Sequence, residues 1–268
     1  VAGLVDGVNL SAGVTSSCSV LLSGQVLCWG DNAYGQLGDG TTNSRNSAVF
    51  TLIIEGRSSP TFALPPAICG GQRIDFTNDP QNCGACEQRC AQNATCVASQ
   101  CQCSDGSRCA WKCLSSGGCD DPVQLSSGLR YTCALRGQGE IYCWGTNNFG
   151  QLGNGTVTTA LVPSAVSGIS SAEQVSAGTS HACARLQNGV VQCWGINTSG
   201  QLGTGNFASQ IRPQTVSGVS GVIDVAAGGK HSCAVIQSGD VYCWGANDWG
   251  QLGNGTLVGT TLPSLVTG

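Results

Sequence analysis

Four pairs of cysteines, whose members lie ten positions apart in each pair, constrain this chain more than any other feature. The second cysteine of every pair is followed by Trp-Gly and, a few residues later, by Gly-Gln-Leu-Gly. The pairs are Cys18 and Cys28, Cys133 and Cys143, Cys183 and Cys193, and Cys233 and Cys243. The last three pairs recur at intervals of 50 residues, and a period of this length is typical of repeat architectures. The pattern predicts four copies of one structural unit.

Each unit predicts short strands separated by glycine turns. An apolar stretch such as Ile223-Asp224-Val225 comes first, a second strand carries the first cysteine, and a third strand carries the second cysteine. A glycine always lies six residues after the first cysteine, where its positive φ suits a tight hairpin: Gly24, Gly139, Gly189 and Gly239. No stretch has the 3.6-residue periodicity of a helix, so the expected fold class is all-β.

The hairpin places the two cysteines of a unit on neighbouring strands. Facing residues of an antiparallel pair have Cα atoms about 4.5–5.5 Å apart, which is within the range of a disulfide. The sequence therefore predicts four disulfides, each within one unit.

A long insertion separates the first unit from the second. Cys133 follows Cys18 by 115 residues, which is one repeat of 50 residues and 65 more. We therefore expect a first unit at 1–50, a linker and insertion at 51–121, and units two to four at 122–268. The insertion holds ten further cysteines: Cys69, Cys83, Cys86, Cys90, Cys96, Cys101, Cys103, Cys109, Cys113 and Cys119.

So dense a set of cysteines predicts a small lobe that is held together by disulfides, because so short a segment lacks the area for a core. The sequence does not reveal their connectivity. The alternative is a metal knuckle formed by Cys83 and Cys86 with Cys101 and Cys103.

The cysteine content and the low charge indicate in which compartment the protein works and which classes of partner it can bind. Its 18 cysteines favour an oxidising compartment, so we expect a secreted protein, extracellular or at the cell surface. Charged residues are only 10% of the chain and the net charge is −4, without the Lys/Arg cluster that nucleic-acid binding needs. No apolar run is long enough to cross a bilayer, so we expect no membrane insertion.

The residues that usually carry catalysis show no catalytic pattern. Paired carboxylates, a nucleophile elbow and a phosphate loop are all missing from the sequence. The two histidines, His181 and His231, occupy equivalent positions that hold Tyr131 and Ser16 in the other units, which favours a structural role. A metal site from the two histidines would lack a third ligand. We therefore expect no enzyme activity, no cofactor and no resident metal.

Two other repeated positions suggest structural roles. An asparagine lies two residues after each Trp-Gly, where its side chain commonly forms a turn: Asn32, Asn147, Asn197 and Asn247. The tryptophans at a single repeat position are expected in the core: Trp29, Trp144, Trp194 and Trp244.

The repeated motifs resemble the regulator-of-chromosome-condensation repeat. They are Ala-Gly-x-x-His-x-Cys, from Ala177 to Cys183 and from Ala227 to Cys233, then Cys-Trp-Gly-x-Asn and Gly-Gln-Leu-Gly. The resemblance implies β-propeller blades of four antiparallel strands. The version with two cysteines per repeat is similar to that of secreted bacterial proteins, and the stretch from Asp79 to Cys103 resembles a stigma-specific-type cysteine-rich segment.

The family's propellers usually have seven blades, whereas only four units are present. Val1-Ala2-Gly3 and Val266-Thr267-Gly268 occupy the same phase of the repeat. We therefore expect a partial propeller, or one that other copies complete.

The resemblance to secreted inhibitors of this fold implies that a partner would contact the loop before the first cysteine of each unit. The matching candidates for partner binding are Arg130, Tyr131, His181, Lys230 and His231. A second repeated position, just before Gly-Gln-Leu-Gly, holds Tyr34, Phe149 and Trp249. These aromatic residues either pack between blades or form an exposed row for a glycan or a protein partner.

These expectations combine into a non-enzymatic extracellular β-propeller scaffold, a structural or adhesive component of a surface assembly that associates with protein partners or with copies of itself. The alternative is a secreted binding or inhibitor protein that recognises a partner through one loop face. Nucleotide exchange on a small GTPase, which the family's nuclear namesake implies, conflicts with the cysteine usage and the low charge.

Overall fold

The computed structural model describes residues 7–22, 24–51 and 120–267, together with four short strands inside the cysteine-rich segment. These four are β5 (Ile68–Cys69), β6 (Gln72–Arg73), β7 (Ala94–Val97) and β8 (Gln100–Cys103), paired as β5–β6 and β7–β8. The disulfides and the metal knuckle predicted for the ten cysteines of 69–119 lie outside the described side chains.

Each repeat folds into one antiparallel sheet of four strands, which we number as blades 1 to 4. Blade 1 contains β1 (Gly7–Ala12), β2 (Ser16–Leu21), β3 (Val26–Gly30) and β4 (Arg45–Phe50). Blade 2 contains β9 (Pro122–Ser127), β10 (Tyr131–Arg136), β11 (Ile141–Gly145) and β12 (Ala160–Ala165). Blade 3 contains β13 (Ala172–Ala177), β14 (His181–Leu186), β15 (Val191–Gly195) and β16 (Gln210–Thr215). Blade 4 contains β17 (Val222–Ala227), β18 (His231–Ile236), β19 (Val241–Gly245) and β20 (Thr260–Leu265).

The expected fold class is confirmed, because the described elements are all strands. The predicted cysteine hairpins are confirmed as well: within each blade the two cysteines face each other, with Cα atoms 4.0 or 4.1 Å apart, and form a disulfide. The hairpin glycines have the positive φ that the turn requires, for example 87° at Gly139 and 91° at Gly239.

The fourth strand of each blade was implied by the family resemblance and not by the residues themselves. In blades 2 to 4 it contains Pro163, Pro213 and Pro263, and it pairs only with the third strand. Proline lacks the N–H that a second partner strand would need, so it is compatible with a strand at the edge of a sheet.

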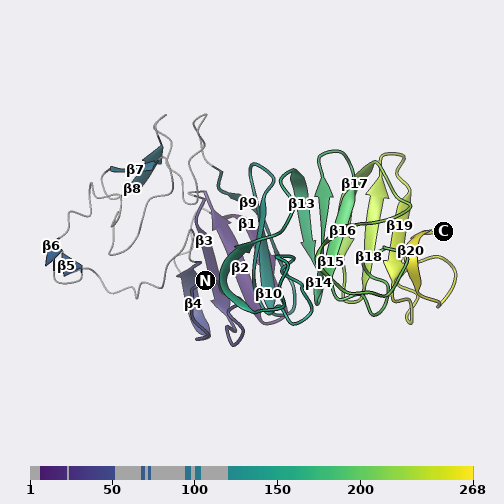
Figure 1. Cartoon of the computed structure of the whole chain (residues 1–268), viewed down its shortest axis with the longest axis horizontal. Coiled ribbons are helices and arrows are strands. Elements are labelled where there is room, and N and C mark those ends of the chain that lie inside the picture. The colour runs from purple at the N-terminus through teal and green to yellow at the C-terminus, as the bar shows by residue number, and fades with distance from the viewer. Residues whose placement is uncertain are drawn as a thin grey trace.

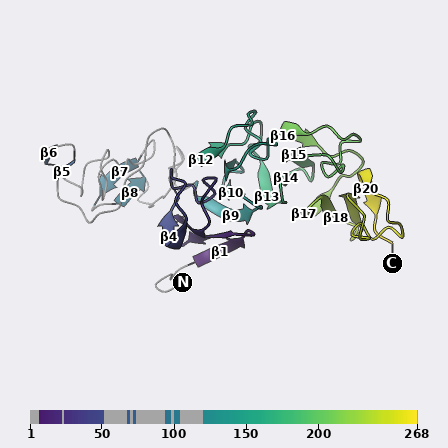
Figure 2. The same cartoon turned by 90° about the horizontal axis from the view of Figure 1, so that it is seen from below.

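The four blades follow one another along an arc, with the first strand of each blade on the inner side (Figures 1 and 2). Three buried clusters form the core, and each cluster joins two neighbouring blades. Between blades 1 and 2, for example, Trp144 packs with Val20 and Leu37. The core therefore lies between sheets, and each blade depends on its neighbours for burial of its apolar faces.

Candidate functional site

One tryptophan contact fixes each joint between blades. Trp194 Nε1 donates a hydrogen bond to the carbonyl of Gln151 at 2.9 Å, and Trp244 Nε1 donates to the carbonyl of Gln201 at the same distance. Trp144 Nε1 donates in the same way to the carbonyl of Gln36, which precedes it by 108 residues rather than 43. The difference of 65 residues is the excess over one repeat that separates the first unit from the second. The three tryptophans are fully buried, so the joints hold the Gly-Gln-Leu-Gly stretches in fixed positions.

The asparagine after Trp-Gly braces the long loop between the third and fourth strands of each blade. In blade 3, Asn197 Oδ1 accepts from the N–H of Leu202 at 2.9 Å, and Asn197 Nδ2 donates to the carbonyls of Asn206 at 2.9 Å and Ala208 at 3.1 Å. The equivalent asparagines are buried and make matching bonds. The predicted turn-forming role is confirmed. We call these four braced loops, residues 31–44, 146–159, 196–209 and 246–259, the rim loops.

Large apolar side chains are exposed on the rim loops of blades 2 to 4. The exposed fraction is 46% for Phe149, 64% for Phe207 and 91% for Trp249. Three further exposed residues belong to the set: Val157, Leu257 and Val258. Side chains of this kind on rigid loops are suited to bury area against a partner without a large loss of conformational entropy.

Sequence reasoning identified Phe149 and Trp249 but missed the other four residues. Val157, Leu257 and Val258 follow the Gly-Thr turn, and Phe207 follows Gly205-Asn206, where the sequence suggested only a connection. The signal that could have identified them is an apolar side chain inside an otherwise polar loop.

Tyr34 behaves differently from its equivalents. The guanidinium of Arg130 lies 4.5 Å from the centre of the Tyr34 ring, and Arg130 Nη1 donates to Tyr34 Oη at 3.2 Å. Tyr34 therefore packs between blades, against Arg130 of blade 2, whereas Phe149 and Trp249 are exposed. Arg130 and Lys230 are also exposed.

Two of the candidate partner-binding residues are buried, which corrects the prediction for them. Tyr131 is 1% exposed, and its hydroxyl donates to the carbonyl of His181 in the next blade. His181 is fully buried, and His231 is partly exposed. Tyr131 and His181 therefore belong to the blade joints and cannot contact a partner from outside.

The hydrogen bonds around His181 determine its tautomer. Ser232 Oγ donates to the carbonyl of Gln201 at 2.9 Å, so it accepts from His181 Nε2 at 2.9 Å, and Nδ1 is left unprotonated. Burial, together with the nearby His231, lowers the pKa of His181 to about 3. Burial also lowers the pKa of His231. His181 is therefore a neutral structural residue at neutral pH, as its repeat position suggested.

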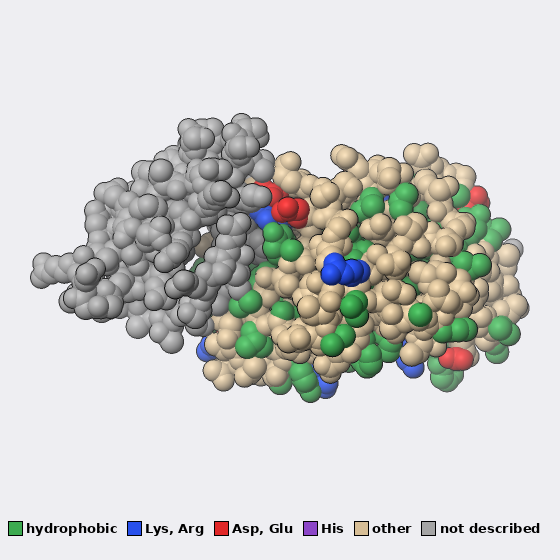
Figure 3. All heavy atoms as spheres, viewed as in Figure 1, with side chains coloured by type: hydrophobic (Ala, Val, Ile, Leu, Met, Phe, Trp, Pro, Cys, Tyr) green, Lys and Arg blue, Asp and Glu red, His purple; other side chains and the backbone are tan. Residues whose placement is uncertain are grey.

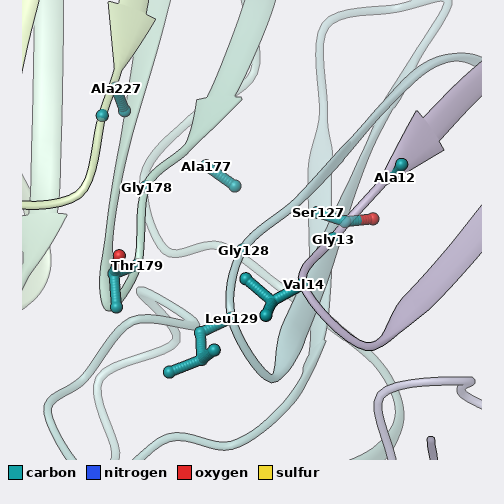
Figure 4. Close-up of a pocket in the computed structure, with 11 residues that line it drawn as sticks. Ala12, Gly13, Val14, Ser127, Gly128, Leu129, Ala177, Gly178, Thr179 and Ala227 are labelled. Carbon is teal, nitrogen blue, oxygen red and sulfur yellow. The ribbon is translucent and has the colours of Figure 1, made fainter.

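A shallow hollow of about 280 Å³ lies at the ends of the inner strands (Figure 4). Equivalent small residues of the four blades line it, among them Gly13, Gly128, Gly178 and Gly228. No ionisable side chain is among its lining residues, so the lining holds no acid or base beside the hydroxyls of Ser127 and Thr179. Within 7–51 and 120–267 no cluster of His, Cys, Asp or Glu has the makings of a metal site, and no helix long enough to span a membrane occurs in the described structure.

Solved structures of low sequence identity share this fold. Human WBSCR16 superposes with a TM-score of 0.67 at 20% identity, over 99% of this chain and 54% of that chain. Yeast RCC1 (Prp20), solved bound to Kap60, superposes with a TM-score of 0.52 at 19% identity, over 96% of this chain and 63% of that chain. This chain thus spans only part of the length of either protein.

Sequence comparison gives the family. The human E3 ubiquitin-protein ligase HERC2 is 36% identical over 47 residues, which are 18% of this chain and 1% of that protein. The regulator of chromosome condensation (RCC1) repeat matches residues 23–62, 138–185, 188–235 and 238–268, and a second description of the same repeat matches the segments 8–36, 123–151, 172–201 and 222–251. The chain therefore belongs to the RCC1 repeat family of β-propeller proteins.

Proposed function

We propose that this protein is a non-enzymatic extracellular scaffold, a structural or adhesive component of a surface assembly that binds its protein partner through the rim loops. The observation that carries the proposal is the set of exposed apolar side chains on loops that are braced by hydrogen bonds from buried asparagines. Such loops present a fixed surface, and a scaffold needs a fixed surface more than it needs chemistry.

The disulfides support a location outside the cell. Each blade has one disulfide between strands, and in blades 1 to 3 both cysteines are fully buried. Bonds of this kind form and persist in oxidising compartments. The likeness of the paired-cysteine repeat to secreted bacterial proteins, and of the insertion to stigma-specific-type segments, agrees with this location.

The composition of the surface favours a protein or a glycan as the partner and argues against nucleic acid. Figure 3 shows a face on which uncharged polar groups and scattered apolar side chains predominate, with few charged side chains. Nucleic acids are bound mainly through clustered Lys and Arg. Among proteins of the same fold, yeast Prp20 has been solved with the protein Kap60 and studied for binding to Gsp1p and histones.

A second candidate function is a secreted binding or inhibitor protein that recognises one partner through the rim. The nearly complete exposure of Trp249, at 91%, favours this candidate because single exposed tryptophans often anchor interfaces. Particle imaging distinguishes the two functions, since an assembly protein forms extended particles and an inhibitor remains discrete.

Location is tested by immunodetection of the protein on intact and on permeabilised source cells, and in the culture medium. We expect signal on intact cells or in the medium. A signal that requires permeabilisation would contradict the extracellular proposal.

Partner binding is tested with the tagged chain and chemical cross-linking on the surface of source cells. The variant Phe207→Asp/Leu257→Asp changes the rim, and Leu22→Asp/Val123→Asp is the matched control because those residues are also exposed but lie outside the rim loops. We expect one cross-linked protein with the wild type and the control, and at least a tenfold loss with the rim variant. Equal cross-linking by all three proteins would contradict the rim as the binding surface.

A further inference from the structure

The two outermost blades present the two halves of the contact that joins the inner blades. Blade 1 has no preceding blade and blade 4 no following blade within the described residues. We define the head face as the side of blade 1 that includes Ser17 and Trp29, and the tail face as the side of blade 4 that includes His231 and the carbonyl of Gln251.

The head face carries two hydrogen-bond donors of a joint. Between blades 3 and 4, Ser232 Oγ and Trp244 Nε1 both donate to the carbonyl of Gln201 at 2.9 Å. Between blades 1 and 2, Thr132 Oγ1 and Trp144 Nε1 both donate to the carbonyl of Gln36. Thr132, Trp144, Ser232 and Trp244 are fully buried.

The equivalent residues of blade 1 are Ser17 and Trp29, and both are partly exposed. Ser17 repeats the hydroxyl of Thr132 and Ser232, which blade 3 lacks because it has Ala182 there. The head face therefore carries both hydrogen-bond donors of a joint, and the described hydrogen bonds include no acceptor for either donor.

The tail face carries the matching acceptor. Gln251 is equivalent to Gln36, Gln151 and Gln201, which are buried in their joints, whereas Gln251 is partly exposed. His231 is equivalent to His181, whose ring bonds to Ser232 of the next blade at 2.9 Å. The residue that would face His231 by the same geometry is Ser17 of an incoming blade 1.

The inner strands add a directional set of side-chain acceptors. Gln124 and Gln174 accept from the N–H groups of Val175 and Val225 at 3.0 Å, and Ser126 and Ser176 accept from those of Ala177 and Ala227 at 2.9 Å. Asn9 and Ser11 do the same to β9.

Blade 4 repeats this set only in part. At the matching positions it has Asp224, which keeps an oxygen acceptor, and Ala226, which does not. A joint made by the tail face would therefore lack one of these hydrogen bonds.

We propose that the tail face docks on the head face of a second copy of this chain, with Trp29 Nε1 and Ser17 Oγ of one copy donating to the Gln251 carbonyl of the other. This assigns the self-association partner within the proposed scaffold function and rests on that function. The interface joins two different surfaces, so it closes into a ring or grows into a filament according to the rotation per copy. The described blades of two copies number eight, which is within the range of about four to eight blades in known propellers.

Two blocking variants test the joint. Ser17→Arg places a long charged side chain on the head face, and Ala226→Arg places one on the tail face, at residues that are exposed or partly exposed in the single copy. Ser170→Arg is the matched control, because Ser170 is exposed between blades 2 and 3. Sedimentation velocity of the whole chain reports the mass.

We expect assemblies from the wild type and from Ser170→Arg, and monomers from each blocking variant alone. An equimolar mixture of the two blocking variants should form a one-to-one dimer and stop there, because one intact head face and one intact tail face remain. Circular dichroism of the monomeric variants establishes that they are folded.

A gain of affinity provides an independent test. Ala226→Ser restores the missing hydroxyl acceptor for the N–H of Ala12 in the second copy, so we expect association about fivefold tighter than in the wild type. A wild type that is monomeric at its highest soluble concentration would overturn the proposal, as would a mixture that behaves like its separate components. Neither outcome affects the rim-loop cross-linking, so failure of this joint and failure of the proposed function are distinguishable.

Discussion

Asp120 and Arg136 form a buried ion pair, with Arg136 Nη2 2.8 Å from Asp120 Oδ2. Arg136 Nε also donates to the carbonyl of Asp120 at 2.8 Å, and the N–H of Gln138 donates to Asp120 Oδ1 at 2.9 Å. The side chains are 1% and 5% exposed for Asp120 and Arg136, respectively. This cluster fixes the chain where it enters blade 2 after the cysteine-rich segment.

Loss of the Asp120 charge should destabilise blade 2. Asp120→Asn removes the buried carboxylate that pairs with Arg136 and leaves the guanidinium with the partly exposed carboxylate of Glu140, so we expect the free energy of unfolding to fall by about 3 kcal/mol. Urea unfolding measures the change. Glu140→Gln is the matched control, since Glu140 also pairs with Arg136 but is 38% exposed, and it should cost less than about 1 kcal/mol. Equal losses in the two variants would contradict this account.

The rim loops should depend on their buried asparagines. Asn197→Ala removes one acceptor and two donated bonds and leaves the Leu202 N–H without its partner, so we expect a loss of about 3 kcal/mol. Hydrogen exchange at residues 197–209 should accelerate together with this loss. Asn188→Ala is the control, because Asn188 is exposed and makes one local bond to Val190. If exchange in the loop were unchanged, the brace would be dispensable.

A single strand-to-strand disulfide should contribute measurably to stability. The double variant Cys183→Ala/Cys193→Ala removes a bond across a loop of ten residues, and we expect a loss of about 2–3 kcal/mol. Thermal unfolding of the oxidised protein measures it, and peptide mapping without reductant verifies the three other bonds. The difference between wild type and variant should vanish when both are reduced, and a difference that persists would point to packing rather than to the bond.

Acid should weaken the fold through His181. Its pKa is about 3 in the folded protein and about 6.5 in the unfolded chain, so unfolding takes up a proton between these values. The stability that this group contributes is complete above pH 6.5 and declines as the pH falls toward 3, by up to about 1.4 kcal/mol per pH unit. Urea unfolding from pH 7.5 to 4.5 measures the slope.

The matched variant is His181→Tyr, since blade 2 has Tyr131 at the equivalent position. We expect a shallower slope, with the remainder from His231, whose pKa burial also lowers. An unchanged slope would show that His181 does not cause the acid sensitivity.

The sequence predicted the parts of the fold that repeat. The ten-residue spacing of the cysteines and the glycine between them determine a hairpin by local geometry alone, and the four disulfides followed from it. The buried position of Trp144, Trp194 and Trp244 was also predictable. Trp29, which was expected in the core as well, is instead partly exposed, because no blade precedes it within the described residues.

The burial of Tyr131 and His181 was not predictable from one unit. A strand of an open sheet alternates between buried and exposed residues, but β10 is covered on both faces and is buried throughout. In β18, which has a neighbouring blade on one side only, buried and partly exposed residues alternate over the first four positions. The exposure of a repeat position therefore depends on the neighbouring blade, and one copy of the repeat does not contain that information.

The tryptophan contact has a consequence for the number of blades that such a chain can have. Trp194 and Trp244 each reach back 43 residues, and blades 2 to 4 recur every 50 residues. Excision of residues 166–215 would therefore bring Trp244 to the Gln151 carbonyl in the register that Trp194 now occupies. Duplication of the same 50 residues would add a joint identical to those already present. A gene of this kind can gain or lose whole blades by recombination between its own repeats, without the need for a new interface to evolve.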